Sequence, residues 1–113
     1  MINSVTIIGR LTRDPEYRQA PESTAIAVCT VAVDRDKDKT DFIPVIAFGE
    51  LANNVCKYVK KGHLVGILGR ISQRSFVRQD GTKGQSIEVI AQTVDFLEKK
   101  PEENEKPKAK KKA

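Results

Sequence analysis

Tryptophan is absent from this chain of 113 residues, and cysteine and histidine are scarce. The two cysteines, Cys29 and Cys56, are too few for a disulfide framework or for a zinc site made of cysteines alone. We expect both to be buried, reduced thiols of a cytoplasmic protein, with a disulfide between them as the alternative.

Long apolar runs are also missing. No stretch approaches the ~20 consecutive apolar residues that a membrane helix needs. Residues 1–4 lack the basic region and the apolar stretch with which a secretion signal begins. The sequence therefore predicts a cytoplasmic protein that does not associate with a membrane.

The motifs of common enzyme classes do not occur either. There is no glycine-rich phosphate loop, no zinc-ligand spacing and no nucleophile elbow. The single histidine, His63, stands in a predicted loop, where we interpret it as a surface residue. Asp34, Asp36 and Asp38 resemble the start of a calcium loop, but Lys39 stands where that loop needs glycine. We therefore predict no catalytic residue, no metal and no cofactor.

Positive charge is concentrated near the end of the sequence. The formal net charge is +5. Residues 1–98 hold 13 basic and 12 acidic side chains, whereas residues 99–113 hold seven lysines, three glutamates and no large apolar residue. We therefore predict one folded domain over residues 1–98 and a disordered, lysine-rich tail over residues 99–113.

Within the folded part, hydrophobic periodicity favours strands. We expect strands at residues 2–10, 24–33, 42–48 and 64–71, followed by a hairpin with arms at 73–77 and 85–97. Asp80 and Gly81 form a typical hairpin turn between these arms. Residues 50–60 have helical spacing and are followed by Gly62, a common residue after a helix end.

The order of these elements is three strands, one helix, and then two more strands or one long bent hairpin. This is the layout of an OB-fold. The sequence thus predicts an all-β, five-stranded Greek-key barrel with one helix between the third and fourth strands. The RNA-recognition fold needs two helices and a characteristic aromatic string, and the sequence has neither.

The six aromatic residues are candidates for ligand contacts because aromatics are scarce. Tyr58 and Phe96 fit positions that face the core, and we assign them there. Phe42 and Phe48 are six residues apart and therefore point to the same face of a strand.

Phe76 lies among arginines. Arg70, Arg74 and Arg78 share its even-numbered parity, which places all four side chains on one face of a regular strand. Aromatic rings among guanidinium groups can stack bases and neutralise phosphates. The alternative is that the rings fill the core and the arginines form an ordinary solvated face.

Several blocks of the sequence resemble the bacterial and phage single-stranded DNA-binding proteins. These are residues 3–18 (NSVTIIGRLTRDPEYR), 41–49 (DFIPVIAFG), 58–62 (YVKKG), 69–76 (GRISQRSF) and 87–91 (IEVIA), in the order of the family. The resemblance covers residues 1–98. It implies an OB-fold that coats single-stranded DNA without sequence preference during replication, recombination and repair. It also implies a homo-oligomer, with a tetramer as the usual form and a dimer as the alternative.

The resemblance further implies which side chains contact the DNA. The base-stacking residues would be Phe42, Phe48 and Phe76. The phosphate-binding residues would be Arg10, Lys61, Arg70, Arg74 and Arg78.

The sequence departs from the family in three respects. The lack of tryptophan implies weaker stacking per base, and Glu50 replaces a commonly basic residue, which removes one phosphate contact. The sequence also has no acidic tip ending in phenylalanine, through which cellular members recruit replication and repair enzymes. We expect the lysine-rich tail to add phosphate contacts instead, and the missing tip favours a phage or plasmid protein.

Two other functions remain open from the sequence. One is an accessory protein of replication, of the primosome type, which binds mainly other proteins. The other is an RNA-binding OB domain of translation.

Overall fold

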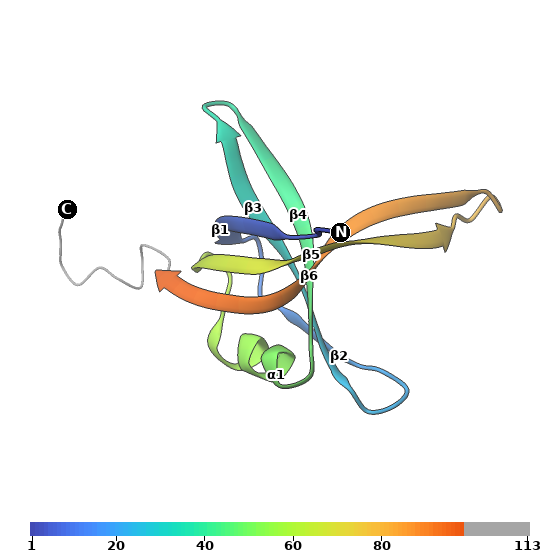
Figure 1. Cartoon of the computed structure of the whole chain (residues 1–113), viewed down its shortest axis with the longest axis horizontal. Coiled ribbons are helices and arrows are strands. Elements are labelled where there is room, and N and C mark those ends of the chain that lie inside the picture. Colours follow the sequence, from blue (N-terminus) through green and yellow to red (C-terminus); the bar gives the residue numbers. More distant parts are fainter. Residues whose placement is uncertain (99–113) are drawn as a thin grey trace.

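The computed structural model describes residues 1–98 (Figure 1), so the predicted tail at 99–113 lies outside the described residues. The elements in chain order are β1 (Val5–Leu11), β2 (Glu16–Gln19), β3 (Ala25–Asp36), β4 (Lys39–Phe48), α1 (Gly49–Tyr58), β5 (Leu64–Val77) and β6 (Lys83–Glu98). No helix among these residues is long and apolar enough to cross a membrane.

Five of the strands close into a ring in the order β1-β5-β6-β4-β3. The ring closes where β3 returns to β1, with Val31 opposite Leu11. β4 and β6 run parallel and meet near Val45 and Val89, while the other neighbours are antiparallel. The chain therefore has the predicted five-stranded OB barrel, with α1 following the third strand of the ring.

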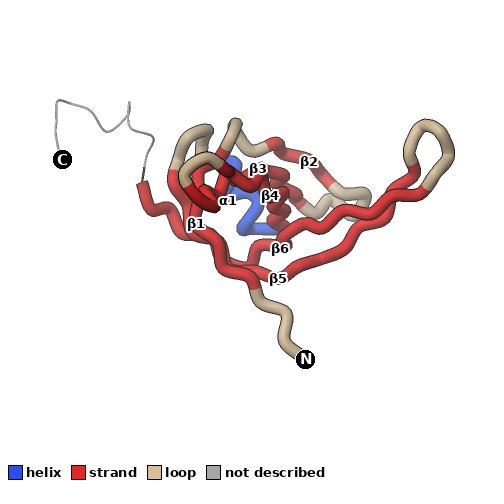
Figure 2. The backbone as a smooth tube through the Cα atoms, turned by 90° about the horizontal axis from the view of Figure 1, so that it is seen from above, coloured by secondary structure: helices blue, strands red, loops and turns tan. Residues whose placement is uncertain are grey.

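The structure differs from the prediction at β2. β2 pairs with the edge of β3 outside the ring, and its four side chains are all exposed, so no alternation marked it in the sequence. Of the two predicted alternatives after the helix, the structure has one long hairpin, because β5 is a single strand that pairs with β6 over its full length. Beyond the barrel, β5 and β6 continue as the long hairpin arm seen in Figure 2. The predicted turn is present at Asp80–Gly81, where Gly81 has a φ of 89°, a conformation that glycine adopts readily.

α1 begins one residue before the predicted start and ends two residues before the predicted end. Ala52 and Val55 are its buried residues, and the helix packs against β3 and β4. It therefore adds apolar side chains to the cluster inside the barrel.

The core of the described chain contains no phenylalanine and no tyrosine. Its buried apolar residues are Leu11, Ala25, Ala27, Cys29, Val31, Val45, Ile46, Ala47, Ala52, Val55, Val59, Val65, Ile67, Val89 and Ala91. All four phenylalanines and both tyrosines are between 38% and 64% exposed. The assignment of Tyr58 and Phe96 to the core is therefore wrong. Ala52, Val55 and Val59 take the core-facing positions around α1, which leaves Tyr58 on the surface, and Phe96 lies partly exposed near the end of β6.

The interpretation of His63 as a surface residue is also wrong. It is 5% exposed, and its ring meets that of Phe96 edge-on at a centroid distance of 5.1 Å. The two cysteines are free, as expected, with Cys29 buried and Cys56 partly exposed. Burial raises the pKa of the Cys29 thiol to about 11, with a smaller contribution from Cys56.

Two glycines allow the strands to approach closely. A Cβ atom at Gly9 would overlap the carbonyl oxygen of Ala32 on β3, and one at Gly69 would overlap that of Ile90 on β6. Gly69 also adjoins the point where the β5–β6 register shifts, as expected of a glycine at a bulge. Backbone therefore packs directly against backbone at these two positions.

We predict that Gly9→Ala and Gly69→Ala each lower the free energy of unfolding by about 1–3 kcal/mol, because the new methyl group must displace backbone atoms. Gly66→Ala is the matched control, since a Cβ atom there would lie 3.5 Å from the nearest atom, in the flexible Leu97 side chain. Urea denaturation measures all three variants. Equal stability of the three would contradict the close approach.

Candidate functional site

The outer face of β4 carries two of the predicted aromatic residues. Side chains alternate along a strand, so Val45 and Ala47 fill the core while Phe42 and Phe48 point outward. Phe48 is also the residue that precedes the first turn of α1. The two rings are therefore held on a strand whose inner face is fixed by packing.

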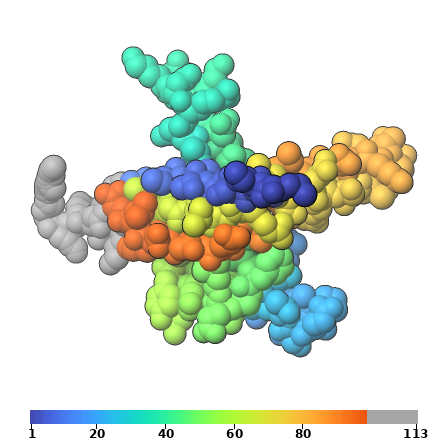
Figure 3. Space-filling view, in the orientation of Figure 1, coloured from blue at the N-terminus to red at the C-terminus, as the bar shows by residue number. Residues whose placement is uncertain are grey.

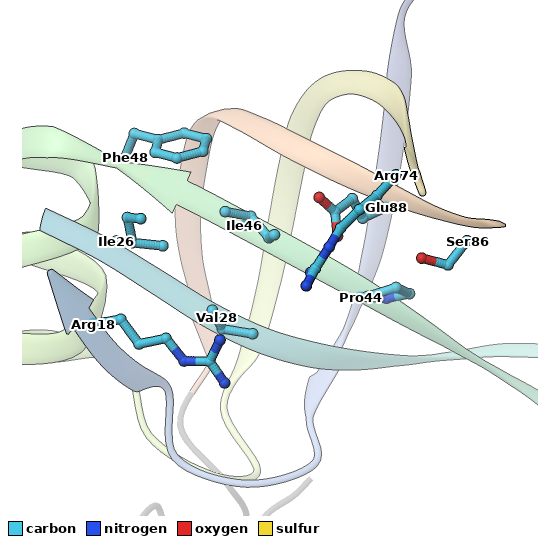
Figure 4. A pocket seen from close by; sticks show the side chains of 9 residues that line it. All are labelled: Arg18, Ile26, Val28, Pro44, Ile46, Phe48, Arg74, Ser86 and Glu88. Atoms are coloured by element: carbon cyan, nitrogen blue, oxygen red, sulfur yellow. The ribbon is translucent and has the colours of Figure 1, made fainter. Parts of the chain in front are cut away.

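A pocket of about 410 Å³ lies on this outer face (Figure 4). Its lining residues are Arg18, Ile26, Val28, Pro44, Ile46, Phe48, Arg74, Ser86 and Glu88. They come from β2, β3, β4, β5 and β6. The pocket thus has an apolar floor on β3 and β4, an aromatic ring at one end, and charged groups at its sides.

Both arginines of the pocket are paired with carboxylates. Nε of Arg18 donates to Glu16 at 3.0 Å, and Nη1 of Arg74 lies 3.7 Å from the carboxylate of Glu88. The hydrogen bond from Arg18, and then its charge, lower the pKa of Glu16. Glu88 is 12% exposed whereas Arg74 is 59% exposed. The guanidinium of Arg74 is therefore accessible to a ligand while its partner is largely covered.

Phe76 lies further along the β5–β6 arm, on the same face of β5 as Arg70 and Arg74. From Gly69 to Val77 the β5–β6 register is regular, so residues at even separations share a face. Arg74 is opposite Ser86, which also lines the pocket, and Phe76 is two residues beyond Arg74. The predicted arginine and aromatic face is thus continuous with the pocket.

The ring of Phe76 rests on the backbone of Gly84. A Cβ atom at Gly84 would lie 2.6 Å from Cζ of the ring and 2.6 Å from Nη2 of Arg78. The Arg78 guanidinium lies 5.3 Å from the centre of the ring, and its Nη1 donates to the carbonyl oxygen of Lys83 at 2.8 Å. Gly84 therefore provides the space in which the ring and the guanidinium lie together.

Two predicted phosphate-binding residues are placed elsewhere. Nη2 of Arg10 donates to Glu98 at 2.7 Å, and its Nη1 donates to the carbonyl oxygen of Gly62 at 2.8 Å. Lys61 follows α1, and its backbone N–H donates to Asp14. Neither Arg10 nor Lys61 lines the pocket that holds Phe48 and Arg74.

Sequence reasoning missed Arg18 and Glu88 as parts of this site. Arg18 lies on β2, which the hydrophobic pattern did not indicate. Glu88 alternates with apolar residues in a predicted strand. Because Arg74 is opposite Ser86, Glu88 lies two residues from the partner of Arg74 and on the same face of the sheet. The parity of Glu88 in the sequence could have indicated this. Its low exposure comes from the three-dimensional packing of the pocket.

Comparison with known proteins identifies relatives of the whole barrel. The model of the single-strand binding protein family matches residues 2–97. The single-stranded DNA-binding protein of Clostridium tetani is 45% identical over 103 residues, which cover 86% of this chain and 71% of that protein. Single-stranded DNA-binding protein 3 of Clostridium acetobutylicum is 43% identical over 103 residues, covering 86% and 72%. Single-stranded DNA-binding protein 1 of Lactococcus lactis is 39% identical over 125 residues, covering 96% and 83%.

Proposed function

The chain belongs to the single-strand binding protein family, and we propose that it coats exposed single-stranded DNA with the outer face of β3, β4 and the β5–β6 arm. One observation carries this mechanism: the barrel excludes every phenylalanine from its core and holds three of them on or beside this face. Large exposed apolar groups at such a density mark a binding surface.

Phe42, Phe48 and Phe76 are the proposed base-stacking residues. Every base has a π-face, so stacking on these rings needs no particular sequence. The apolar floor of the pocket, formed by Ile26 and Ile46 among others, accepts the edge of a base next to Phe48. A duplex hides these base faces, and the mechanism therefore requires a single strand.

Arginines beside the rings are the proposed phosphate contacts. Arg70 and Arg74 lie on β5, and Arg78 comes directly after it at the start of the turn. Arg18 adds a cation from β2. A phosphate that binds Arg74 must compete with Glu88, which lowers the net gain from that contact. Arg10 and Lys61, which lie outside the pocket, are proposed as contacts for a strand that extends beyond it.

The proposed role is binding alone, without catalysis or a cofactor, and it takes place in the cytoplasm on strands exposed during replication, recombination and repair.

We also propose that the chain forms a homo-oligomer through β1. β5 pairs with β1 along Val5–Arg10, whereas β3 reaches only Arg10 and Leu11, so one edge of residues 5–9 has no strand beside it within the described chain. Ile8 is exposed on the outer surface of this strand, next to Gly66 of β5. An open apolar edge favours pairing with a second copy, and two such dimers can form a tetramer.

The chain is expected to bind single strands more tightly than duplexes of the same length, because stacking needs exposed base faces. The slope of log affinity against log salt concentration should be about −0.7 for each neutralised phosphate. Fluorescence anisotropy with labelled single-stranded DNA, duplex DNA and single-stranded RNA measures both quantities. Equal affinity for the duplex would reject the stacking mechanism, and a preference for RNA would favour the translation alternative.

Replacing Phe42, Phe48 or Phe76 with alanine should weaken DNA binding by about 1–3 kcal/mol for each ring lost. These rings are exposed, so the free energy of unfolding should fall by far less than the roughly 3–5 kcal/mol that a buried phenylalanine costs. Binding isotherms are measured beside thermal melts of the same variants. Variants that lose stability but keep their affinity would show that the rings serve packing instead.

Light scattering should give the mass of a dimer or a tetramer at micromolar concentration, since the β1 edge and Ile8 would otherwise remain exposed to water. A concentration series checks whether the mass falls on dilution, as expected of a reversible association. A monomer throughout the series would contradict the pairing of β1.

A further inference from the structure

A second group of exposed aromatic residues lies at the far end of α1, away from Phe48. Tyr58, the last residue of the helix, is 62% exposed, and Phe96 on β6 is 47% exposed. A cavity of about 300 Å³ lies between the helix and the strand, which adjoin in Figure 3. Its lining residues are Leu51, Asn54, Val55, Tyr58, Val59, Val94 and Phe96.

His63 connects Phe96 with the loop that follows α1. The ring of Phe96 meets the buried ring of His63 edge-on. Nδ1 of His63 accepts a hydrogen bond from the backbone N–H of Lys60 at 3.1 Å, which ties the loop after α1 to the same histidine. Phe96 and the loop that carries the lysines therefore both contact His63.

Lysines lie next to Tyr58 at the end of α1, whereas Phe96 is flanked on β6 by Asp95 and by Glu98, which is paired with Arg10. Nζ of Lys57 lies 5.2 Å from the centre of the Tyr58 ring, and Lys60 and Lys61 follow directly after the helix. The residues that line this cavity include no carboxylate, in contrast to the Phe48 pocket with its Glu88. The nearby carboxylate of Asp14 accepts from the backbone N–H of Lys61.

We propose that Tyr58, Phe96, Lys57 and Lys60 form a second subsite for single-stranded DNA, which we call the α1-end subsite. The inference rests on the proposed function and extends it, because these residues take no part in the pocket described above. Exposed rings beside lysines combine base stacking with phosphate attraction, the two interactions that hold a single strand. A polyanion with flat apolar groups fits this surface better than an apolar or basic partner does.

The position of the α1-end subsite fits a DNA strand that continues from the pocket lined by Phe48 and Arg74, called the main pocket below. Phe48 immediately precedes α1 and Tyr58 ends it, so the backbone positions of the two residues are separated by the length of a ten-residue helix. That length is about 15 Å, which corresponds to roughly four nucleotides at the spacing of one strand in a duplex. A short oligonucleotide that occupies the main pocket therefore does not reach Tyr58, whereas a longer one does.

The test compares Tyr58→Ala with Tyr58→Phe over a series of oligo(dT) lengths, from about 4 to about 16 nucleotides, the range of OB-fold site sizes. Tyr58 is mostly exposed, so both variants are expected to melt at the temperature of the unmodified protein. Tyr58→Phe keeps the ring and is the matched control. We expect Tyr58→Ala to bind the longest oligonucleotides about five- to one-hundred-fold more weakly and the shortest ones equally well.

Three results would overturn the proposal: an equal loss at all lengths, no loss at any length, or a change of oligomeric mass in Tyr58→Ala without a change in affinity. The last result would mean that a second copy of the chain covers the surface. If the unmodified protein bound no oligonucleotide of any length, the proposed function itself would fail, which distinguishes the two outcomes.

Discussion

The close approach of the strands around Gly9 and Gly69 leaves the barrel an interior that valine, alanine and a few larger aliphatic side chains fill. Val31, Val45 and Val65 are the largest fully buried side chains. All four phenylalanines lie outside this interior and are between 38% and 64% exposed. Such exposure costs solubility unless a ligand or a second chain covers the rings, and the proposed binding surface is built from three of them.

The alternation of side chains determines where these exposed rings lie. On β4 the inner positions are held by the core, and this fixes Phe42 and Phe48 on the opposite face. The β5–β6 arm extends the same face beyond the barrel and places Phe76 on the backbone of Gly84, beside Arg78. Glu16 and Glu88 already pair with Arg18 and Arg74, so the proposed binding of DNA in this pocket depends less on net charge than on the apolar floor and the ring.

Much of this arrangement was predictable from the sequence, and the exceptions have physical reasons. Strand periodicity located the five strands of the barrel and the shared face of Phe42 and Phe48, because both follow from a repeat of two residues. β2 escaped prediction because its four side chains are all exposed and it depends on the edge of β3. Periodicity also assigned Phe96 to the core, but the ring is partly exposed although Val65 opposite it is fully buried, because strand parity predicts the face of a residue and not how far its neighbours cover it.

The central claim is that the rings excluded from the core are the surface that receives single-stranded DNA. Fluorine NMR of the chain labelled with 4-fluorophenylalanine tests it most directly, because four phenylalanines give four signals that single Phe→Leu variants assign. Titration with a short single-stranded oligonucleotide should shift the signals of Phe42, Phe48 and Phe76 until saturation, and the duplex should leave them in place. Saturable binding that leaves these three signals unchanged would contradict the account.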